Sequence, residues 1–272
     1  MKPKARRLRD FLAASRNIAL VEVIEAKGST PREVATWMLV SRDAIFGTIG
    51  GGQLEFMAIA RAREMIEQNV ETTRLDVPLG PEIGQCCGGH VKLYLVLLDE
   101  ELREAIPQRI SFEEEIQPHV YLFGGGHVGH ALAQALALLP LTVAMVETRP
   151  EELLGAPEGV RTIATAVPEE IVRGAPAGSA FVILTHDHAL DFLIVSEALG
   201  RNDAAYVGMI GSKTKKATFK SWYLREAGGG EEAFDKLVCP IGGSSVKDKR
   251  PSVIAALVSA ELLHFLPGER QI

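Results

Sequence analysis

The sequence predicts an α/β protein with a C-terminal Rossmann-like parallel sheet and a smaller N-terminal α/β domain. Strand and helix patterns alternate through the second half, as they do in chains built from βαβ units. A glycine-rich turn follows the first strand of that half and opens a helix. The chain has 272 residues, which is long for one compact domain and enough for two hydrophobic cores.

The N-terminal domain is expected over residues 1–100. A helix fits the first amphipathic stretch, and segments rich in Val, Ile and Leu then indicate strands. A second helix is expected to begin at a triple glycine, with Leu54, Ala58, Met65 and Ile66 near one face. The predicted elements are a helix at 4–15, strands at 17–28, 36–42 and 44–50, the helix after residue 50, and strands at 71–77 and 90–99.

Residues 101–118 are interpreted as a linker, because the acidic and polar run "DEELREAIPQRISFEEEIQP" offers little to a core. The Rossmann-like domain is expected over 119–272. Its strands are predicted at 119–124, 141–147, 180–185, 204–210 and 237–241, and its helices at 127–139, 190–200, 213–227 and 251–266.

Composition excludes several classes of protein. The formal net charge of −6 argues against a broad nucleic-acid-binding surface. No apolar run approaches the roughly 18 residues of a membrane helix, and the basic start is not followed by a signal-peptide core. The three cysteines cannot form a disulfide framework. We therefore expect a cytoplasmic protein with reduced thiols, bound to neither nucleic acid nor membrane.

The glycine turn of the second half contains Gly124, Gly126 and Gly129 in the spacing G-x-G-x-x-G. Such glycines let the backbone turn tightly and approach a diphosphate at a helix N-terminus. Glu147 ends the next strand, where folds of this kind place a carboxylate that accepts from ribose hydroxyls. The alternative is that the glycines only allow the helix to pack closely on the strand.

Two further loops follow strands of the same sheet. "LTHDHALD" offers His186, His188 and Asp191. They can serve as ligand contacts or as general acid or base, as metal ligands, or as parts of an ordinary packed or solvated loop. "YVGMIGSKTKK" places Ser212 and Lys213 at a helix start, which suits an anion, although solvated lysines are an equal alternative.

The first half contains a comparable loop, "GTIGGGQLE". Gly50, Gly51 and Gly52 can hold an anion on backbone amides, while Glu55 can bind there or only favour the helix dipole. "GSTPRE" at 28–33 is a turn that can bind phosphate or cap a local bend.

The stretch "GQCCGG" at 84–89 places two of the three cysteines side by side between glycines. Cys86 and Cys87 lack the apolar neighbours of a structural cysteine, with Gln85 beside them. We interpret them as reactive thiols or soft ligands; a tight turn with incidental cysteines is the alternative.

Five of these motifs, "TIGGGQLE", "GQCCGG", "FGGGHVG", "THDHALD" and "YVGMIGSKTK", resemble those of the XdhC/CoxI-like xanthine dehydrogenase accessory proteins in order and spacing. The resemblance implies a molybdenum cofactor chaperone, without xanthine turnover of its own. Such a protein binds molybdopterin, works with a cysteine desulfurase during sulfuration of the cofactor, and delivers it to xanthine dehydrogenase.

The resemblance also implies site residues. Gln85, Cys86 and Cys87 then belong to the cofactor site, with either thiol near molybdenum, and the Rossmann half contributes its glycines, His186, His188 and Asp191 to the same site. Docking of large enzymes is compatible with a homodimer. Two alternatives are an NAD(P)-dependent oxidoreductase, which leaves "GQCCGG" unexplained, and a regulatory module with a nucleotide at the Rossmann turn.

Overall fold

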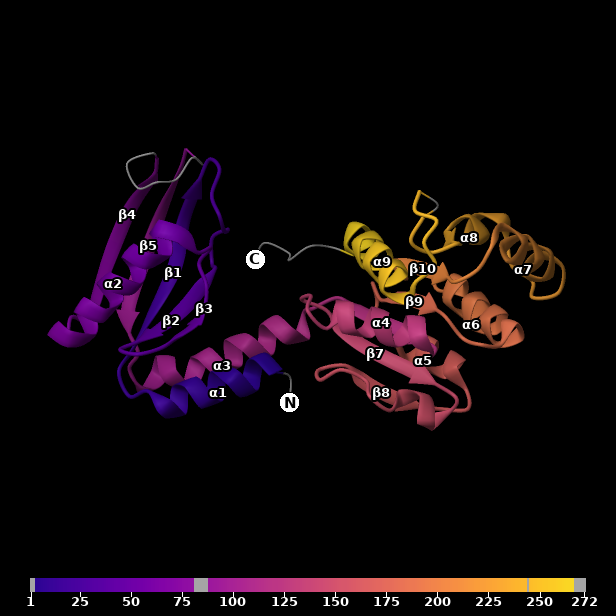
Figure 1. Ribbon diagram of the computed structural model, residues 1–272, viewed down its shortest axis with the longest axis horizontal. Coiled ribbons are helices and arrows are strands. Elements are labelled where there is room, and N and C mark those ends of the chain that lie inside the picture. Colours follow the sequence, from indigo (N-terminus) through magenta and orange to yellow (C-terminus); the bar gives the residue numbers. More distant parts are fainter. Residues whose placement is uncertain (1–2, 81–87, 244, 267–272) are drawn as a thin grey trace. The chain divides into compact units, whose positions relative to one another are not determined.

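The computed structural model describes residues 3–80, 88–243 and 245–266, and the chain divides into two compact units. The first unit is Met1–Phe112 and the second is Glu113–Ile272. Figure 1 shows their elements. Each unit is described by itself. No helix in the described ranges is long and apolar enough to cross a bilayer.

In the described part of the N-terminal unit, five strands form an antiparallel sheet in the order β3-β2-β1-β5-β4. The elements, in chain order, are α1 (Pro3–Ala14), β1 (Ile18–Lys27), β2 (Trp37–Ser41), β3 (Ile45–Gly47), α2 (Gly52–Gln68), β4 (Thr72–Leu79), β5 (Gly89–Leu97) and α3 (Glu100–Glu115).

Both faces of this sheet are covered, because successive side chains of a strand point to opposite sides. On one face Ala19, Val21 and Val23 of β1 pack in a cluster with α2. On the other face Ile18 and Leu20 pack in a cluster with residues of α1 and α3.

The interpretation of residues 101–118 as a linker is wrong for most of that segment. Helix α3 fills it and buries Ile106 and Ile110, which are four residues apart and therefore lie on the same side of the helix. Glu100 and Glu101 occupy the first turn, where they complement the helix dipole. A narrow apolar stripe inside an acidic segment was enough to make a packed helix.

In the described part of the C-terminal unit, six strands form a parallel sheet in the order β11-β10-β9-β6-β7-β8. The elements, in chain order, are β6 (His119–Phe123), α4 (His127–Leu136), β7 (Thr142–Glu147), the 3-10 helix η2 (Pro150–Leu153), β8 (Arg161–Ala164), α5 (Pro168–Gly174), β9 (Ala180–Ile183), α6 (His188–Gly200), β10 (Tyr206–Met209), α7 (Lys213–Arg225), α8 (Glu231–Asp235), β11 (Leu237–Val238) and α9 (Pro251–Phe265). The predicted α/β class with a Rossmann-like sheet is confirmed.

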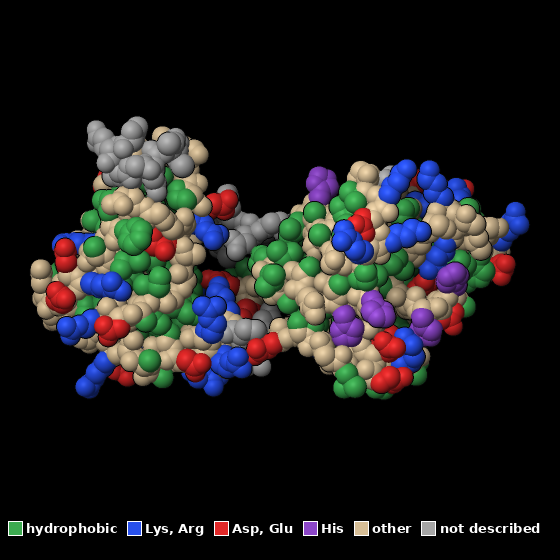
Figure 2. Space-filling model, viewed as in Figure 1, with side chains coloured by type: hydrophobic (Ala, Val, Ile, Leu, Met, Phe, Trp, Pro, Cys, Tyr) green, Lys and Arg blue, Asp and Glu red, His purple; other side chains and the backbone are tan. Residues whose placement is uncertain are grey.

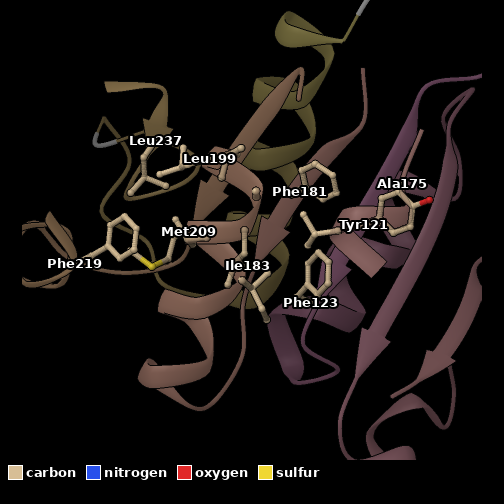
Figure 3. Close-up of a cluster of buried hydrophobic side chains, with 14 of the residues drawn as sticks. Tyr121, Phe123, Ala175, Phe181, Ile183, Leu199, Met209, Phe219 and Leu237 are labelled. Carbon is tan, nitrogen blue, oxygen red and sulfur yellow. The ribbon is translucent and has the colours of Figure 1, made fainter. Parts of the chain in front are cut away.

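Helices cover both faces of the parallel sheet. Residues of α4 and α9 pack with Val120 and Leu122 of β6 on one face. Tyr121 and Phe123 point to the other face, where they pack with Phe181 in a cluster that includes residues of α6 and α7 (Figure 3). The chain order reverses between β6 and β9, and in such sheets that reversal marks the ligand-binding edge.

Candidate functional site

The three glycines of the Rossmann turn have different roles in the structure. Gly124 has a φ of 125°, and a Cβ there would lie 2.5 Å from the carbonyl oxygen of Leu184. A Cβ at Gly129 would lie 2.0 Å from the carbonyl oxygen of Gly124. A Cβ at Gly126 would meet no atom within 4 Å, and its φ is −73°. Packing therefore requires Gly124 and Gly129, whereas Gly126 keeps open space at the start of α4.

Helix α4 begins at this open position. Gly126 is its N-cap and supplies no side-chain hydrogen bond to the helix. The first N–H groups of any α-helix have no partner inside the helix, and they favour anions. A phosphate can therefore approach the turn at Gly126 without meeting a side chain.

Glu147, expected to contact a ribose, is hydrogen-bonded within its own unit. It is 4% exposed. Its Oε2 accepts from the N–H of Gly125 (2.8 Å), and its Oε1 accepts from the backbone N–H groups of Thr148 (2.9 Å) and Arg149 (3.2 Å). Burial opposes ionisation of Glu147, but these hydrogen bonds outweigh burial and lower its pKa. The carboxylate thus holds the glycine turn in place through the N–H of Gly125.

The loop after β9 carries the predicted histidines. His186 and His188 are exposed, and Asp187 caps α6 by accepting from the N–H of Ala189 (2.7 Å). Asp191 is fully buried, and its Oδ1 accepts from the N–H (3.1 Å) and the hydroxyl (2.7 Å) of Thr185. Asp191 therefore organises this loop from within, while the histidines face solvent.

An ion pair between α6 and α7 joins the segments that follow β9 and β10. Lys215 donates to Oδ2 of Asp191 and to the carbonyl oxygen of Ile210 (3.0 Å), and its side chain is only 11% exposed. Ser212 caps α7 by accepting from the N–H of Lys215 (3.2 Å), and Lys213 is exposed beside it. Because Asp191 also binds Thr185 and Lys215 also binds Ile210, the ion pair holds the two neighbouring loops together at one edge of the sheet.

The structure brings most of the predicted Rossmann residues to that edge. Strands β6, β9 and β10 are neighbours in the sheet, so the loops that follow them adjoin. Hydrogen bonds continue past the strand ends, from Leu184 N to the Phe123 carbonyl (2.7 Å) and from Ile210 N to the Ile183 carbonyl (2.9 Å). Figure 2 shows several histidine side chains on the surface of this unit.

In the N-terminal unit, Glu55 holds the triple-glycine loop. Its Oε2 accepts from the N–H groups of Ile49 (3.0 Å) and Gly51 (3.1 Å) and from the hydroxyl of Thr48. The N–H of Gly50 donates to the Thr48 hydroxyl (3.1 Å). These donors are therefore used by the protein's own side chains, and Gly52 begins α2 beside them.

Three of the predicted motifs meet in this unit. A Cβ at Gly50 would lie 2.6 Å from Cβ of Pro31, so the "GSTPRE" turn packs on the triple-glycine loop. Ser29 pairs with Gly88, and a Cβ at Gly89 would lie 2.2 Å from the Ser29 carbonyl oxygen. The two glycines that end "GQCCGG" therefore lie against the same turn. Gln85, Cys86 and Cys87 lie outside the described residues.

Sequence reasoning missed several residues beside the Rossmann turn. Helix α4 carries three polar residues after the glycines, His127, His130 and Gln134. His130 is hydrogen-bonded to η2, with its Nε2 2.8 Å from the Glu152 carbonyl oxygen. The i, i+3, i+7 spacing of these polar residues on a helix opening at a phosphate turn was the available signal. Among the described residues, no cluster of three or more His, Cys, Asp or Glu side chains is arranged to hold a metal ion.

A parallel sheet with a glycine turn at its reversal point defines a Rossmann-type domain. A family model described as the XdhC Rossmann domain matches residues 120–262, and one described as the XdhC and CoxI family matches residues 11–76. The chain belongs to the XdhC and CoxI family, as the resemblance of its motifs predicted.

Two relatives show the extent of the similarity. The chain is 27% identical over 257 residues to the uncharacterized protein YqeB of Escherichia coli (strain K12); the match covers 90% of this chain and 43% of YqeB. A crystal structure described as a xanthine dehydrogenase from Bacillus halodurans matches with a TM-score of 0.79 at 17% identity, and covers 100% of this chain and 97% of that one. At this identity the structural match supports the fold.

Proposed function

We propose that this chain is an accessory protein of xanthine dehydrogenase. In this proposal it holds a molybdopterin-type cofactor while a cysteine desulfurase supplies sulfur, and it then delivers the cofactor to the apoenzyme. Its own role is binding and transfer rather than turnover. Membership of the XdhC and CoxI family supports the accessory role.

The observation that carries the binding proposal is the open position at Gly126. Packing explains the glycine at 124 and at 129, but it does not explain the one at 126. A glycine at that position removes the side chain that would separate a ligand phosphate from the first amides of α4. The phosphate of the cofactor would be held there, and its pterin would take hydrogen bonds from nearby polar side chains.

The cofactor when bound supplies a molybdenum centre, and the chain would contribute a soft ligand to it. Cys86 and Cys87 are the candidates, because their glycine neighbours leave the thiols without apolar cover in the sequence. Cys239 is a poorer candidate, since burial raises the pKa of its thiol and disfavours the thiolate that binds metals.

One observation weighs against the alternative of an NAD(P)-dependent oxidoreductase. Recognition of a ribose needs a carboxylate with free acceptor capacity at the end of β7. Glu147 already accepts from Gly125, Thr148 and Arg149. With 4% of its surface exposed, Glu147 also leaves little room for ribose hydroxyls to reach the acceptor capacity that remains on its carboxylate.

The proposal is tested by cofactor transfer. The full chain is loaded with the molybdenum-bearing cofactor, a desulfurase and cysteine are added, and activation of apo-xanthine dehydrogenase is followed. We expect Cys86→Ala or Cys87→Ala to lower bound molybdenum and activation, and Cys239→Ala to serve as the matched control. Undiminished binding and activation in both of the first two variants would remove the thiols from the proposal; no activation by the unaltered chain would remove the delivery role.

A further inference from the structure

A groove lies between α4 and η2, directly beside the open end of the glycine turn. It is open to solvent and has a volume of about 360 Å³. Its lining includes Gly126, His127, His130, Ala131, Gln134 and Glu152. Apart from Gly126, these residues were not among the predicted site residues.

The groove has a floor and one fixed wall. On α4, Ala131 is the small residue between larger polar neighbours at 127, 130 and 134, so the middle of the groove stays open. The wall is η2, whose Glu152 carbonyl oxygen would lie 2.4 Å from a Cβ at Gly125. Only a glycine at 125 therefore lets η2 pack this closely on the turn.

His130 of α4 is hydrogen-bonded to η2, and this hydrogen bond defines the tautomer of its ring. Its Nε2 lies 2.8 Å from the Glu152 carbonyl oxygen, which can only accept a hydrogen bond. Nε2 therefore carries the hydrogen, and Nδ1 of the neutral ring is left as an acceptor.

The chemistry of the lining selects a class of ligand. Gln134 presents both a donor and an acceptor, and it is exposed at the groove. The carboxylate of Glu152 is paired with Arg149 at 3.2 Å. The groove thus offers mostly neutral hydrogen-bonding groups over an alanine floor, which suits a flat heterocycle with amide-like edges rather than a second anion.

Two spaces adjoin the glycine turn. The one where a dinucleotide would place its ribose is filled by protein, and the one that leads along α4 is open. Beside Gly125 the space is filled by η2, and Glu147 is occupied by backbone donors. Beside Gly126 no atom lies within 4 Å of the position that a Cβ would take, and the groove begins there. A ligand anchored by its phosphate on the first turn of α4 can therefore extend along α4, but it meets protein where the ribose of a dinucleotide would lie.

We propose that this groove binds the ring of a bicyclic nitrogen heterocycle whose phosphate monoester lies at Gly126 on the first turn of α4. The inference deepens the proposed function and rests on it for the identity of the natural ligand. It adds the groove as the ring site, with Gln134 and His130 as the recognising side chains and Ala131 as the floor. It also excludes ribose-linked dinucleotides from the same turn.

The test uses calorimetric titration of the full chain with hydroxymethylpterin phosphate, with the unphosphorylated alcohol, and with ADP-ribose. Ala131→Leu fills the floor of the groove, and Ala137→Leu makes the same change at an exposed position at the other end of α4 as the control. Gln134→Leu removes the amide without touching the buried face. Thermal unfolding of each variant confirms that the fold is kept.

We expect the phosphate ester to bind, and the alcohol and ADP-ribose to bind at least about tenfold more weakly. Ala131→Leu and Gln134→Leu weaken the ester about tenfold or more, and Ala137→Leu leaves it unchanged. Equal binding of ADP-ribose, an unaffected Ala131→Leu variant, or no binding of the ester would each overturn the inference.

The accessory role and the ligand site in the groove can be refuted independently of each other. If the chain isolated from a cofactor-producing host carries no molybdenum while the ester still binds in the groove, the accessory role falls and the groove stands. If the isolated Ala131→Leu and Gln134→Leu variants keep their full content of molybdenum cofactor, the groove falls and the accessory role stands.

Discussion

Replacing Gly129 or Gly126 by alanine distinguishes the glycine that helix packing requires from the glycine that leaves space for a ligand. At Gly129, a Cβ would lie 2.0 Å from the Gly124 carbonyl oxygen, so α4 or β6 must move by about 1 Å or more. Both groups are backbone, and overpacking of this kind costs roughly 3 kcal/mol at its upper end. The better helix propensity of alanine returns up to about 1 kcal/mol, which leaves a loss of about 2 kcal/mol.

At Gly126 the same substitution meets no atom within 4 Å, and the φ of −73° suits any residue. Its effect on the free energy of unfolding is therefore expected within about 0.5 kcal/mol of zero. Thermal unfolding should show a Tm lower by roughly 4–8 °C for Gly129→Ala and nearly unchanged for Gly126→Ala. Ligand titration should show the reverse sensitivity, with binding lost in Gly126→Ala.

Two results would refute this reasoning. An unchanged Tm for Gly129→Ala would mean that α4 does not pack on the turn as described. Full ligand binding by a folded Gly126→Ala variant would mean that the open space at Gly126 has no part in recognition.

Three other predictions concern stability. The pKa of Glu147 is lower in the folded chain than in the unfolded chain, so its ionised carboxylate stabilises the fold above the unfolded pKa, and this contribution is lost as pH falls through the folded pKa. Glu147→Gln should therefore show a smaller loss of the free energy of unfolding, measured with denaturant, below about pH 4.5. Lys215→Met leaves Asp191 buried without its cation and should lower the free energy of unfolding by about 3 kcal/mol, most of which Asp191→Asn added to it should restore. Ile110→Ala should destabilise the N-terminal unit by about 2–4 kcal/mol in urea unfolding, whereas a linker residue at 110 would change it by less than about 0.5 kcal/mol.

Sequence periodicity was sufficient for the elements that pack with a full apolar face. The strands from β6 to β10 that are buried on both sides appear as continuous apolar runs, and α4 and α9 follow them as expected. Strand β8, with the sequence RTIA, was not predicted, because it is an edge strand with mostly exposed residues and no apolar run. Helix α3 was missed because only a narrow stripe of its surface is apolar.

The candidate site was only partly predictable for a related reason. Spacing identified the glycines at 124, 126 and 129, but only the three-dimensional contacts distinguish the two that packing requires from the one that stays open. Glu147 was located correctly at the end of β7, yet its hydrogen bonds to backbone N–H groups depend on how the turn closes over it. The same holds for Glu55, whose Oε2 accepts from the triple-glycine loop.

The most direct test of the account is chemical analysis of the full chain purified from a host that makes molybdenum cofactor. Molybdenum is measured by mass spectrometry and the pterin phosphate by its fluorescent oxidation product, for the unaltered chain and for Gly126→Ala. The account predicts near-equal amounts of metal and pterin on the unaltered chain and a large loss of both in the variant. A chain that carries neither, or a folded variant that keeps both in full, would contradict it.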